Sequence, residues 1–377
     1  KNSTKEYIMP SKYGINVELH NLSPKSYDIN NTRPIALCGD DSSLQGLHYF
    51  SDVSEAIAAI GEGSIANALK DLESTNLKSQ IIISAFAKKK GEDEAGESEN
   101  IAKVIEAINA LKKCEQELSY KPKFILATEY NDLGVYEKLK QIATSLRAIY
   151  AIELNATDEV GIKQELDSIQ THRAIISFQK VQRIDKTPRP ASAFLIALYA
   201  KVMASSDFGF AHTYSNKVID GVIGVIDTIE YIQGEDCEAD RLRAMGVTTI
   251  FVDNGIRAWG RHTRDTSLGI ESLHSIVIFD TIIETLLASQ KEAIDRQVAD
   301  MVKQLKDDLN SFYRKLVANN VVIGFEISLP EELNTNESIA EGEIYIKQEV
   351  QEMPLISRVV NKIYRVTKYS TQLIKEL

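Results

Sequence analysis

The chain has 377 residues, 44% of them hydrophobic and 26% charged, and its 43 basic and 54 acidic side chains give a net charge of −11. This composition is typical of a folded globular chain with one large domain or two, and it excludes collagen-like, disordered and disulfide-dense proteins. The acidic balance argues against binding of nucleic acid, which needs a basic surface. Cys38, Cys114 and Cys237 are far apart, so they predict neither a disulfide framework nor a zinc site. The longest apolar stretches, such as residues 191–204, are too short to span a membrane.

The first residues of the chain predict a strand followed by a loop. Residues 12–20 alternate, with Ile15, Val17 and Leu19 on one face of the expected strand and polar residues on the other. Residues 21–34 are rich in Asn, Ser and Pro, which is typical of a loop. Because a single strand cannot stabilise itself, this terminal strand needs a sheet edge to join.

From residue 35 to residue 178, short apolar strands alternate with helices. Strands are expected at residues 35–38, 80–87, 124–128, 148–154 and 174–178, and helices at 53–60, 65–72 (with Ser64 as N-cap), 101–118, 132–146 and 158–170. Residues 88–100, with three lysines and five acidic residues, are expected to form a solvated loop. Repeated strand–helix pairs are the pattern of βαβ units, so we expect a mostly parallel sheet covered by helices.

The second half of the chain predicts helices and a hairpin. Pro190 is expected in the first turn of an apolar helix over residues 191–205, and Gly246 at the end of a short helix over residues 239–244. Asp253-Asn254-Gly255 is a strong hairpin turn signal. It is expected to join strands at 247–252 and 256–259. Further on, the patterns predict long helices at 271–288 and 292–317, strands at 321–329 and 343–350, and an extended segment at 355–369 with alternating apolar residues that include Ile356, Val359 and Ile363.

No motif in the sequence carries recognisable catalytic chemistry. There is no phosphate-binding loop with its lysine, no HExxH and no GxSxG, and the six histidines are scattered. The densest polar cluster surrounds the hairpin and includes Arg257, Trp259 and Arg261. It could form an anion site, an interaction anchor, or a hairpin end whose arginines pair with nearby carboxylates. We therefore predict no catalytic residue, cofactor or metal, and we name these three residues as a candidate interface.

Extended segments at both ends of one chain are the most informative prediction. A strand that one subunit adds to the sheet edge of another is β-augmentation. Here the strand of one subunit and the sheet edge of the next are different surfaces. Such a contact does not close as a dimer but propagates as a ring or a helix. We therefore expect residues 1–22 and 353–377 to be arms that join copies of this chain.

Segments along nearly the whole chain, in order, resemble the contractile tail sheath proteins of phages, the Mu-like type above all. Gly246–Ile250 and Asp253–Thr263 are similar to the hairpin of that family, although Asn254 precedes the turn glycine here, and Arg261 and His262 stand where Asn and Arg are usual. The other matching segments are Gly14–Glu18, Thr32–Ile35, Ala36–Asp41, Arg189–Ala193, Tyr214–Val222, Leu316–Asn320 and Glu341–Ile346.

The resemblance implies a structural protein with neither catalysis nor a cofactor. Subunits of that family form stacked hexameric rings or a helix around an inner tube and are joined by terminal arms. When the baseplate triggers it, the sheath contracts and drives the tube through the host envelope during genome delivery. The implied partners are other copies of the chain, the tail tube protein, and the baseplate and tail terminator proteins. The implied location is the virion, after assembly in the bacterial cytoplasm.

A basic face toward an acidic tube is a further expectation from the resemblance. The candidates lie on the predicted helix over residues 292–317 and are Lys303, Lys306, Arg314 and Lys315. Because acidic residues share this segment, a merely solvated helix face is the alternative.

The expected fold is α/β, or α+β overall. A mostly parallel, helix-covered sheet domain precedes a C-terminal sheath domain with the hairpin, the long helices and extended terminal arm strands. The expected boundaries are 1–22 for the N-terminal arm, 23–188 for the α/β domain, 189–352 for the sheath domain and 353–377 for the C-terminal arm.

The alternative to a sheath subunit is an α/β enzyme with a small-molecule site at the carboxyl ends of the parallel strands. It predicts a well-formed pocket with perturbed carboxylates near Ala127–Tyr130 or Glu153–Ala156. A sheath subunit instead predicts long polymers of the chain. A third possibility, an adhesin or secreted effector, is disfavoured by the polar first residues and by the few cysteines.

Overall fold

The computed structural model describes residues 27–89, 94–265, 267, 269–296, 298–367 and 369. Its largest element is a six-stranded sheet with strand order β2-β3-β1-β4-β5-β6, in which only β2 runs antiparallel to its neighbour. The strands are β1 (Ile35–Asp40), β2 (Gly46–Phe50), β3 (Ile81–Phe86), β4 (Phe124–Leu126), β5 (Ile149–Glu153) and β6 (Ala174–Ser177). The mostly parallel sheet is confirmed. The sequence does not predict β2, because the five residues of this edge strand show no clean alternation.

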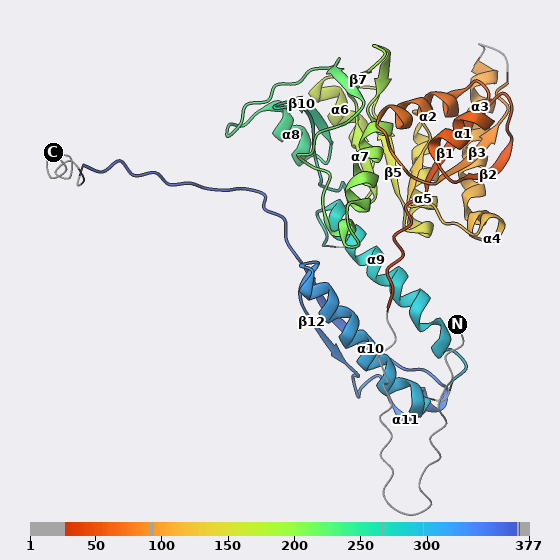
Figure 1. Ribbon diagram of the computed structural model, residues 1–377, viewed down its shortest axis with the longest axis vertical. Coiled ribbons are helices and arrows are strands. Elements are labelled where there is room, and N and C mark those ends of the chain that lie inside the picture. Colours follow the sequence, from red (N-terminus) through yellow and green to blue (C-terminus); the bar gives the residue numbers. More distant parts are fainter. Residues whose placement is uncertain are drawn as a thin grey trace, which may run out of the picture.

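Helices cover both faces of the sheet, so that two hydrophobic cores lie on either side of it (Figure 1). Leu37 and Ile83 point into one core, whereas Ile82 and Tyr150 point into the other, because successive side chains of a strand alternate between faces. The helices of the first core are α1 (Val53–Ala59), α2 (Ser64–Ser74) and α7 (Ser192–Ala204). Those of the second are α3 (Glu94–Ala110), α5 (Leu133–Leu146) and α6 (Glu159–Leu166), with a 3₁₀ turn (Leu111–Lys113) and α4 (Cys114–Leu118) after α3.

Two expectations in this part of the chain are wrong. Ser64 is not the N-cap of α2 but its first residue; Gly63 is the cap, at φ 152°, where a Cβ would lie 2.2 Å from the carbonyl oxygen of Asp40. The expected solvated loop over residues 88–100 is helical from Glu94 onward. Glu99 pairs with a lysine one turn later, so these charges form the exposed face of a helix, which composition alone does not distinguish from a loop.

α7 joins the sheet to the second half of the chain. Ten of its thirteen residues are buried, and they share one hydrophobic core with β1, β3 and α9 (Leu273–Gln290). The predicted domain boundary after residue 188 therefore does not coincide with a gap in the packing, and the boundaries stay a prediction. Pro190, expected in the first turn of α7, instead ends the edge strand β8 (Pro188–Pro190), where a missing backbone N–H is equally tolerated.

The second half of the chain adds small antiparallel sheets. They are the three-stranded sheet β8-β7-β9, with β7 (Lys180–Arg183) and β9 (Val222–Val225), and the hairpin of β10 (Thr249–Val252) and β11 (Ile256–Trp259). The hairpin is confirmed: Asp253, Asn254 and Gly255 join the paired residues Val252 and Ile256, and Asn254 and Gly255 both have positive φ. Gly246 follows α8 (Glu238–Ala244) at φ 87°, as expected for the residue after a helix end.

The last part of the fold extends away from the sheet (Figure 1). α9 leads out, a 3₁₀ turn (Lys291–Ala293) follows, and α10 (Val298–Ala318) returns beside β12 (Val322–Ser328) and β13 (Lys347–Glu352), with α11 (Asn336–Ala340) between these strands in the chain. The strand expected at residues 343–350 begins later, because the backbone N–H of Tyr345 donates to the side chain of Asn334 instead of to a strand.

Residues 353–367 leave the body as an extended segment without helix or strand, shown as the long blue trace that runs outward in Figure 1. Its apolar side chains are open to solvent: Ile356 is 81% exposed, Val359 71% and Ile363 92%. The predicted N-terminal strand with Ile15, Val17 and Leu19 lies outside the described residues.

Candidate functional site

The carboxyl ends of β1, β4 and β5 are where a parallel sheet of this order would place a small-molecule site. Here that crevice is filled, because the hydroxyl of Tyr130 donates to the carboxylate of Asp40 (2.7 Å) and the backbone N–H of Asp40 donates to Ser64 Oγ (3.0 Å). The cavity that remains is lined by residues that include Leu126, Thr128, Glu153 and Ser192. Its volume is about 10 Å³, room for a single water molecule. The pocket that the enzyme alternative predicts near Ala127–Tyr130 or Glu153–Ala156 is therefore not formed.

Glu153 is the perturbed carboxylate of this cavity. It is 8% exposed; the hydroxyl of Ser192 donates to one carboxylate oxygen, and the other oxygen has no hydrogen-bond partner among the described residues. Burial raises the pKa of Glu153 to about 7, since the charged form loses its hydration. Glu153 is thus a buried acid without space beside it for a substrate.

We expect Glu153 to make stability depend on pH. The folded chain holds this proton more tightly than the unfolded chain, so the free energy of unfolding should fall as pH rises from 4.5 to about 7 and stay level on either side. The full change is about 3 kcal/mol. The Glu153→Gln variant should lose this part of the pH dependence and exceed the parent in stability at about pH 8. Urea unfolding of both proteins at about pH 4 and about pH 8 measures it; equal pH dependence of the two would contradict it.

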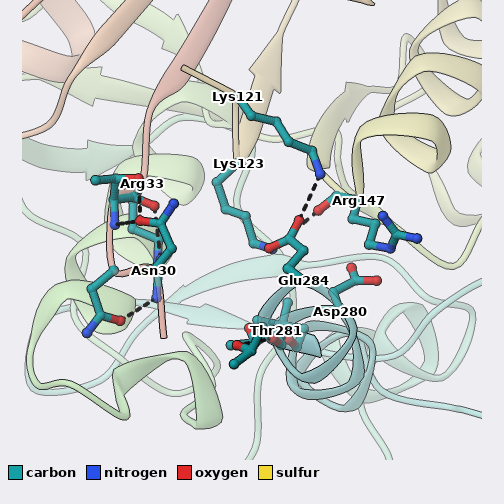
Figure 2. Close-up of polar contacts among 12 residues, drawn as sticks. Asn30, Arg33, Lys121, Lys123, Arg147, Asp280, Thr281 and Glu284 are labelled. Carbon is teal, nitrogen blue, oxygen red and sulfur yellow. Dashed lines mark hydrogen bonds and ion pairs between the residues drawn. The ribbon is translucent and has the colours of Figure 1, made fainter. Parts of the chain in front are cut away.

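Ion pairs tie the amino ends of β4 and β6 to α9; Figure 2 shows Lys121, Lys123 and Glu284. The guanidinium of Arg173, just before β6, donates twice to the carboxylate of Asp280, once at 2.8 Å. Lys121 and Lys123, before β4, contact the two carboxylate oxygens of Glu284 at 3.0 and 3.2 Å. Burial by itself would raise the pKa of Glu284, but the two lysines outweigh it and hold this pKa below its usual value. α9 is therefore attached to the sheet by four charged contacts in addition to its apolar packing.

The predicted candidate interface lies on β11 and just after it, and its side chains have partners inside the chain. Arg257 donates to the carbonyl oxygens of Asp253 (2.7 Å) and Asn216 (2.9 Å). The indole N–H of Trp259 donates to the carboxylate of Asp240 (2.8 Å), and the ring is half-buried. These contacts hold the end of the hairpin in place within the chain. An interface role for Arg257 and Trp259 stays a prediction.

Arg261 has a different position, at the start of the outgoing C-terminal segment. It donates to Ser272 (3.4 Å) and to the hydroxyl of Ser357. Arg261 thus contacts Ser357 near the start of the predicted arm and fixes the arm to the body at this point.

The four cations predicted to face a tube all lie on the exposed face of α10. They are Lys303, Lys306, Arg314 and Lys315. None of them forms an ion pair with a carboxylate within the part of the chain that the structure describes. The opposite face of α10 is buried: Phe312, Tyr313 and Leu316 lie in the hydrophobic core, where Phe312 contacts Tyr27 and Tyr313 contacts Phe325 of β12.

β12 and β13 form a two-stranded antiparallel sheet that α10 covers on one face. Tyr313 of α10 stacks on Phe325 (5.1 Å between ring centres), and its hydroxyl donates to Gln348 (2.8 Å). Among the described residues neither strand has a second neighbour, so each leaves one row of backbone N–H and C=O groups unpaired. Such a sheet can accept further strands.

Other features of the described residues bear on function. No group of three or more His, Cys, Asp or Glu side chains in them could hold a metal ion. No helix in them is long and apolar enough to cross a membrane. Cys38, Cys114 and Cys237 are free and buried.

Sequence patterns miss the buried charges. Arg173, Asp280 and Glu153 belong to no motif, and Arg173 and Asp280 are 107 positions apart. The available signal is that Asp280 and Glu284 stand in a mostly apolar helix, which indicates that cations must meet them there.

Comparison with known proteins identifies tail sheath proteins, although no family model matches the chain. A prophage major tail sheath protein of Pseudomonas aeruginosa (strain UCBPP-PA14) is 26% identical over 306 residues, which covers 77% of this chain and 78% of that protein. The tail sheath protein of Escherichia phage P2 is 25% identical over 187 residues, or 49% of this chain and 46% of the phage protein.

Solved structures agree in fold. The sheath of an extracellular contractile injection system, PVC, in its contracted state has a TM-score of 0.72 at 12% identity and covers 96% of this chain and 99% of that chain. The contracted helical sheath of the anti-feeding prophage has a TM-score of 0.68 at 12% identity, with 95% and 100% covered. At these identities the likeness shows the fold alone, and the sequence relatives carry the assignment. The curated relatives of this chain are thus tail sheath proteins, and its fold is that of contractile sheath subunits.

Proposed function

We propose that this chain is a structural subunit, not an enzyme, that polymerises into a contractile sheath around a tail tube. One observation carries the proposal: the same chain has an extended, exposed C-terminal segment and a two-stranded sheet with free edges. The segment of one subunit adds to the β12–β13 sheet of the next. Because giver and receiver are different surfaces, the contact repeats around a ring or along a helix.

The energetics of such a contact favour a durable connection. Ile356, Val359 and Ile363 are almost fully exposed in the single chain, and burying each in a neighbour contributes about 1.5–3 kcal/mol. Main-chain hydrogen bonds of the added strand come in addition and do not depend on side chains. The arms therefore hold the polymer together while the bodies that they connect change orientation.

Contraction is then a rotation of rigid bodies that the arms keep connected. The ion pairs of Asp280 and Glu284 attach α9 to the sheet, so the module of α10, β12 and β13 moves with the sheet as one body. The extended sheath must be kinetically trapped and must release free energy when better interfaces form. The proposed setting is the virion, with the tube inside and baseplate and terminator proteins at the two ends.

Purification of the full chain tests this proposal. We expect the chain to pellet in the ultracentrifuge as hollow cylinders or stacked rings that negative-stain electron microscopy shows. A chain that stays monomeric at every concentration, in low and in high salt, would contradict it.

We further propose that the exposed face of α10 contacts an acidic tube. A variant with Glu at Lys303, Lys306, Arg314 and Lys315 should still self-assemble. The amount of tube protein that co-sediments with it should fall about tenfold or more, because attractive charge pairs across the interface become repulsive. The matched control changes four exposed lysines elsewhere, Lys70, Lys112, Lys113 and Lys163, and should co-sediment like the parent. Equal loss in both variants would contradict a tube contact through α10.

A further inference from the structure

Two carboxylates face each other on the outer side of the β12–β13 sheet. Glu326 of β12 is directly opposite Glu349 of β13, whereas the next pair along, Phe325 and Val350, faces α10. Like charges at directly opposite positions destabilise an antiparallel pair. Lys347 contacts Glu349 at 2.8 Å, but the carboxylate of Glu326 forms no hydrogen bond or ion pair with any residue that the structure describes. The outer face of this sheet is therefore short of positive charge.

The charge around the sheet and the charge of the outgoing segment are opposite. Residues 322–352 contain eight acidic residues and one basic residue. Residues 353–367 contain no acidic residue and three basic ones, Arg358, Lys362 and Arg365, all exposed. Residues 1–22, the other predicted arm, carry charges of both signs and are a poorer match for an acidic surface.

The spacing of the segment matches the two faces of the sheet. In a strand, Val359 and Ile363 point to one side, which also carries Arg365. Arg358 and Lys362 point to the other side, with Val360 between them. Placed along a free edge, Val359 and Ile363 extend the apolar face that packs on α10, which puts the two cations on the face of Glu326. A slip of one residue would turn Arg358 and Lys362 away from Glu326, so the charge match favours one register.

We infer that Glu326 and Glu349 select the basic C-terminal segment of a second copy of this chain, held through Arg358 and Lys362, as the strand added to the sheet. This inference rests on the proposed function and names the charged side chains through which the receiving sheet recognises the arm. Salt has two opposing effects on assembly. It weakens the attraction between arm and sheet, and it weakens the repulsion between subunits of charge −11. Charge substitutions therefore test the inference more sharply than salt does.

The experiment compares polymer formation by five chains in the ultracentrifuge: the parent, three variants and a matched control. The first variant reverses the arm (Arg358→Glu, Lys362→Glu), the second reverses the sheet (Glu326→Lys, Glu349→Lys), and the third combines all four changes. We expect the pelleted fraction to fall about tenfold or more in the first and second variants and to return to within about twofold of the parent in the third. The matched control (Glu331→Lys, Glu332→Lys) changes two exposed acids outside the strands by the same charge and should pellet like the parent.

A mixture distinguishes a second copy from the same chain. Equal amounts of the arm-reversed and sheet-reversed chains should form polymer together although neither does so alone, because each arm then meets a complementary sheet on the other chain. Failure of the combined variant and of the mixture, with thermal melting like that of the parent, would overturn the charge inference. So would a control that loses as much polymer as the sheet variant. If the parent itself forms no polymer, the proposed function fails as well.

Discussion

A chain without residues 355–377 should fold normally and remain monomeric. The segment is exposed, and removing Ile356, Val359 and Ile363 takes nothing from either hydrophobic core. It does take away the strand that we propose each subunit gives to its neighbour. We expect the pelleted fraction to fall by at least about tenfold, with a change in melting temperature of only about 2 °C or less.

Two further variants sharpen this result. Replacing residues 355–367 by Gly and Ser of equal length should also abolish assembly, since it keeps the reach of the segment but removes its apolar and charged side chains. Deleting residues 1–22 should have the same effect, because Ile15, Val17 and Leu19 are expected to form the other arm. If the shortened chains pellet like the full chain, the arm mechanism is wrong.

Breaking the buried ion pair of Arg173 and Asp280 should give the largest loss of stability from a single substitution. The two side chains are 10% and 5% exposed, so removing one leaves an uncompensated charge in the interior. Arg173→Met and Asp280→Leu should each lower the free energy of unfolding by about 3–5 kcal/mol. The double variant should recover most of that loss, because two apolar side chains leave no charge behind.

Urea unfolding at protein concentrations below those of assembly measures this prediction. Arg241→Met is the matched control, since Arg241 pairs with Glu159 at the surface and its loss should change the midpoint little. If the single variants of Arg173 and Asp280 are as stable as this control, the pair does not have the proposed role. A double variant no more stable than the single variants would also contradict it.

The sequence predicts most of the sheet domain, because its signals are local. Apolar runs of a few residues between amphipathic helices mark β1, β3, β4, β5 and β6, and Asn254-Gly255 marks the hairpin through its backbone requirement. Where a residue type suits two structures, the pattern is misleading. Pro190 fits an edge strand as well as a helix start, and the charges of residues 94–100 fit a helix surface as well as a loop.

Contacts between distant parts of the chain are beyond such reasoning. Nothing local to Arg173 indicates Asp280, and nothing local to Glu326 indicates that Glu349 stands opposite it, because strand register is a property of the folded pair. The exposed C-terminal segment, in contrast, follows from its own pattern. Its apolar residues come in pairs separated by polar pairs, without a second strand nearby in the sequence. The receiving sheet becomes visible only in three dimensions.

A three-dimensional reconstruction by electron microscopy of the polymer formed by the full chain tests the central claim most directly. We expect the β12–β13 sheet to gain at least one strand from another subunit. This strand should be residues 355–367, with Val359 and Ile363 toward α10 and Arg358 and Lys362 beside Glu326. A polymer in which this sheet keeps two strands, or in which residues 355–367 fold back on their own subunit, would contradict it.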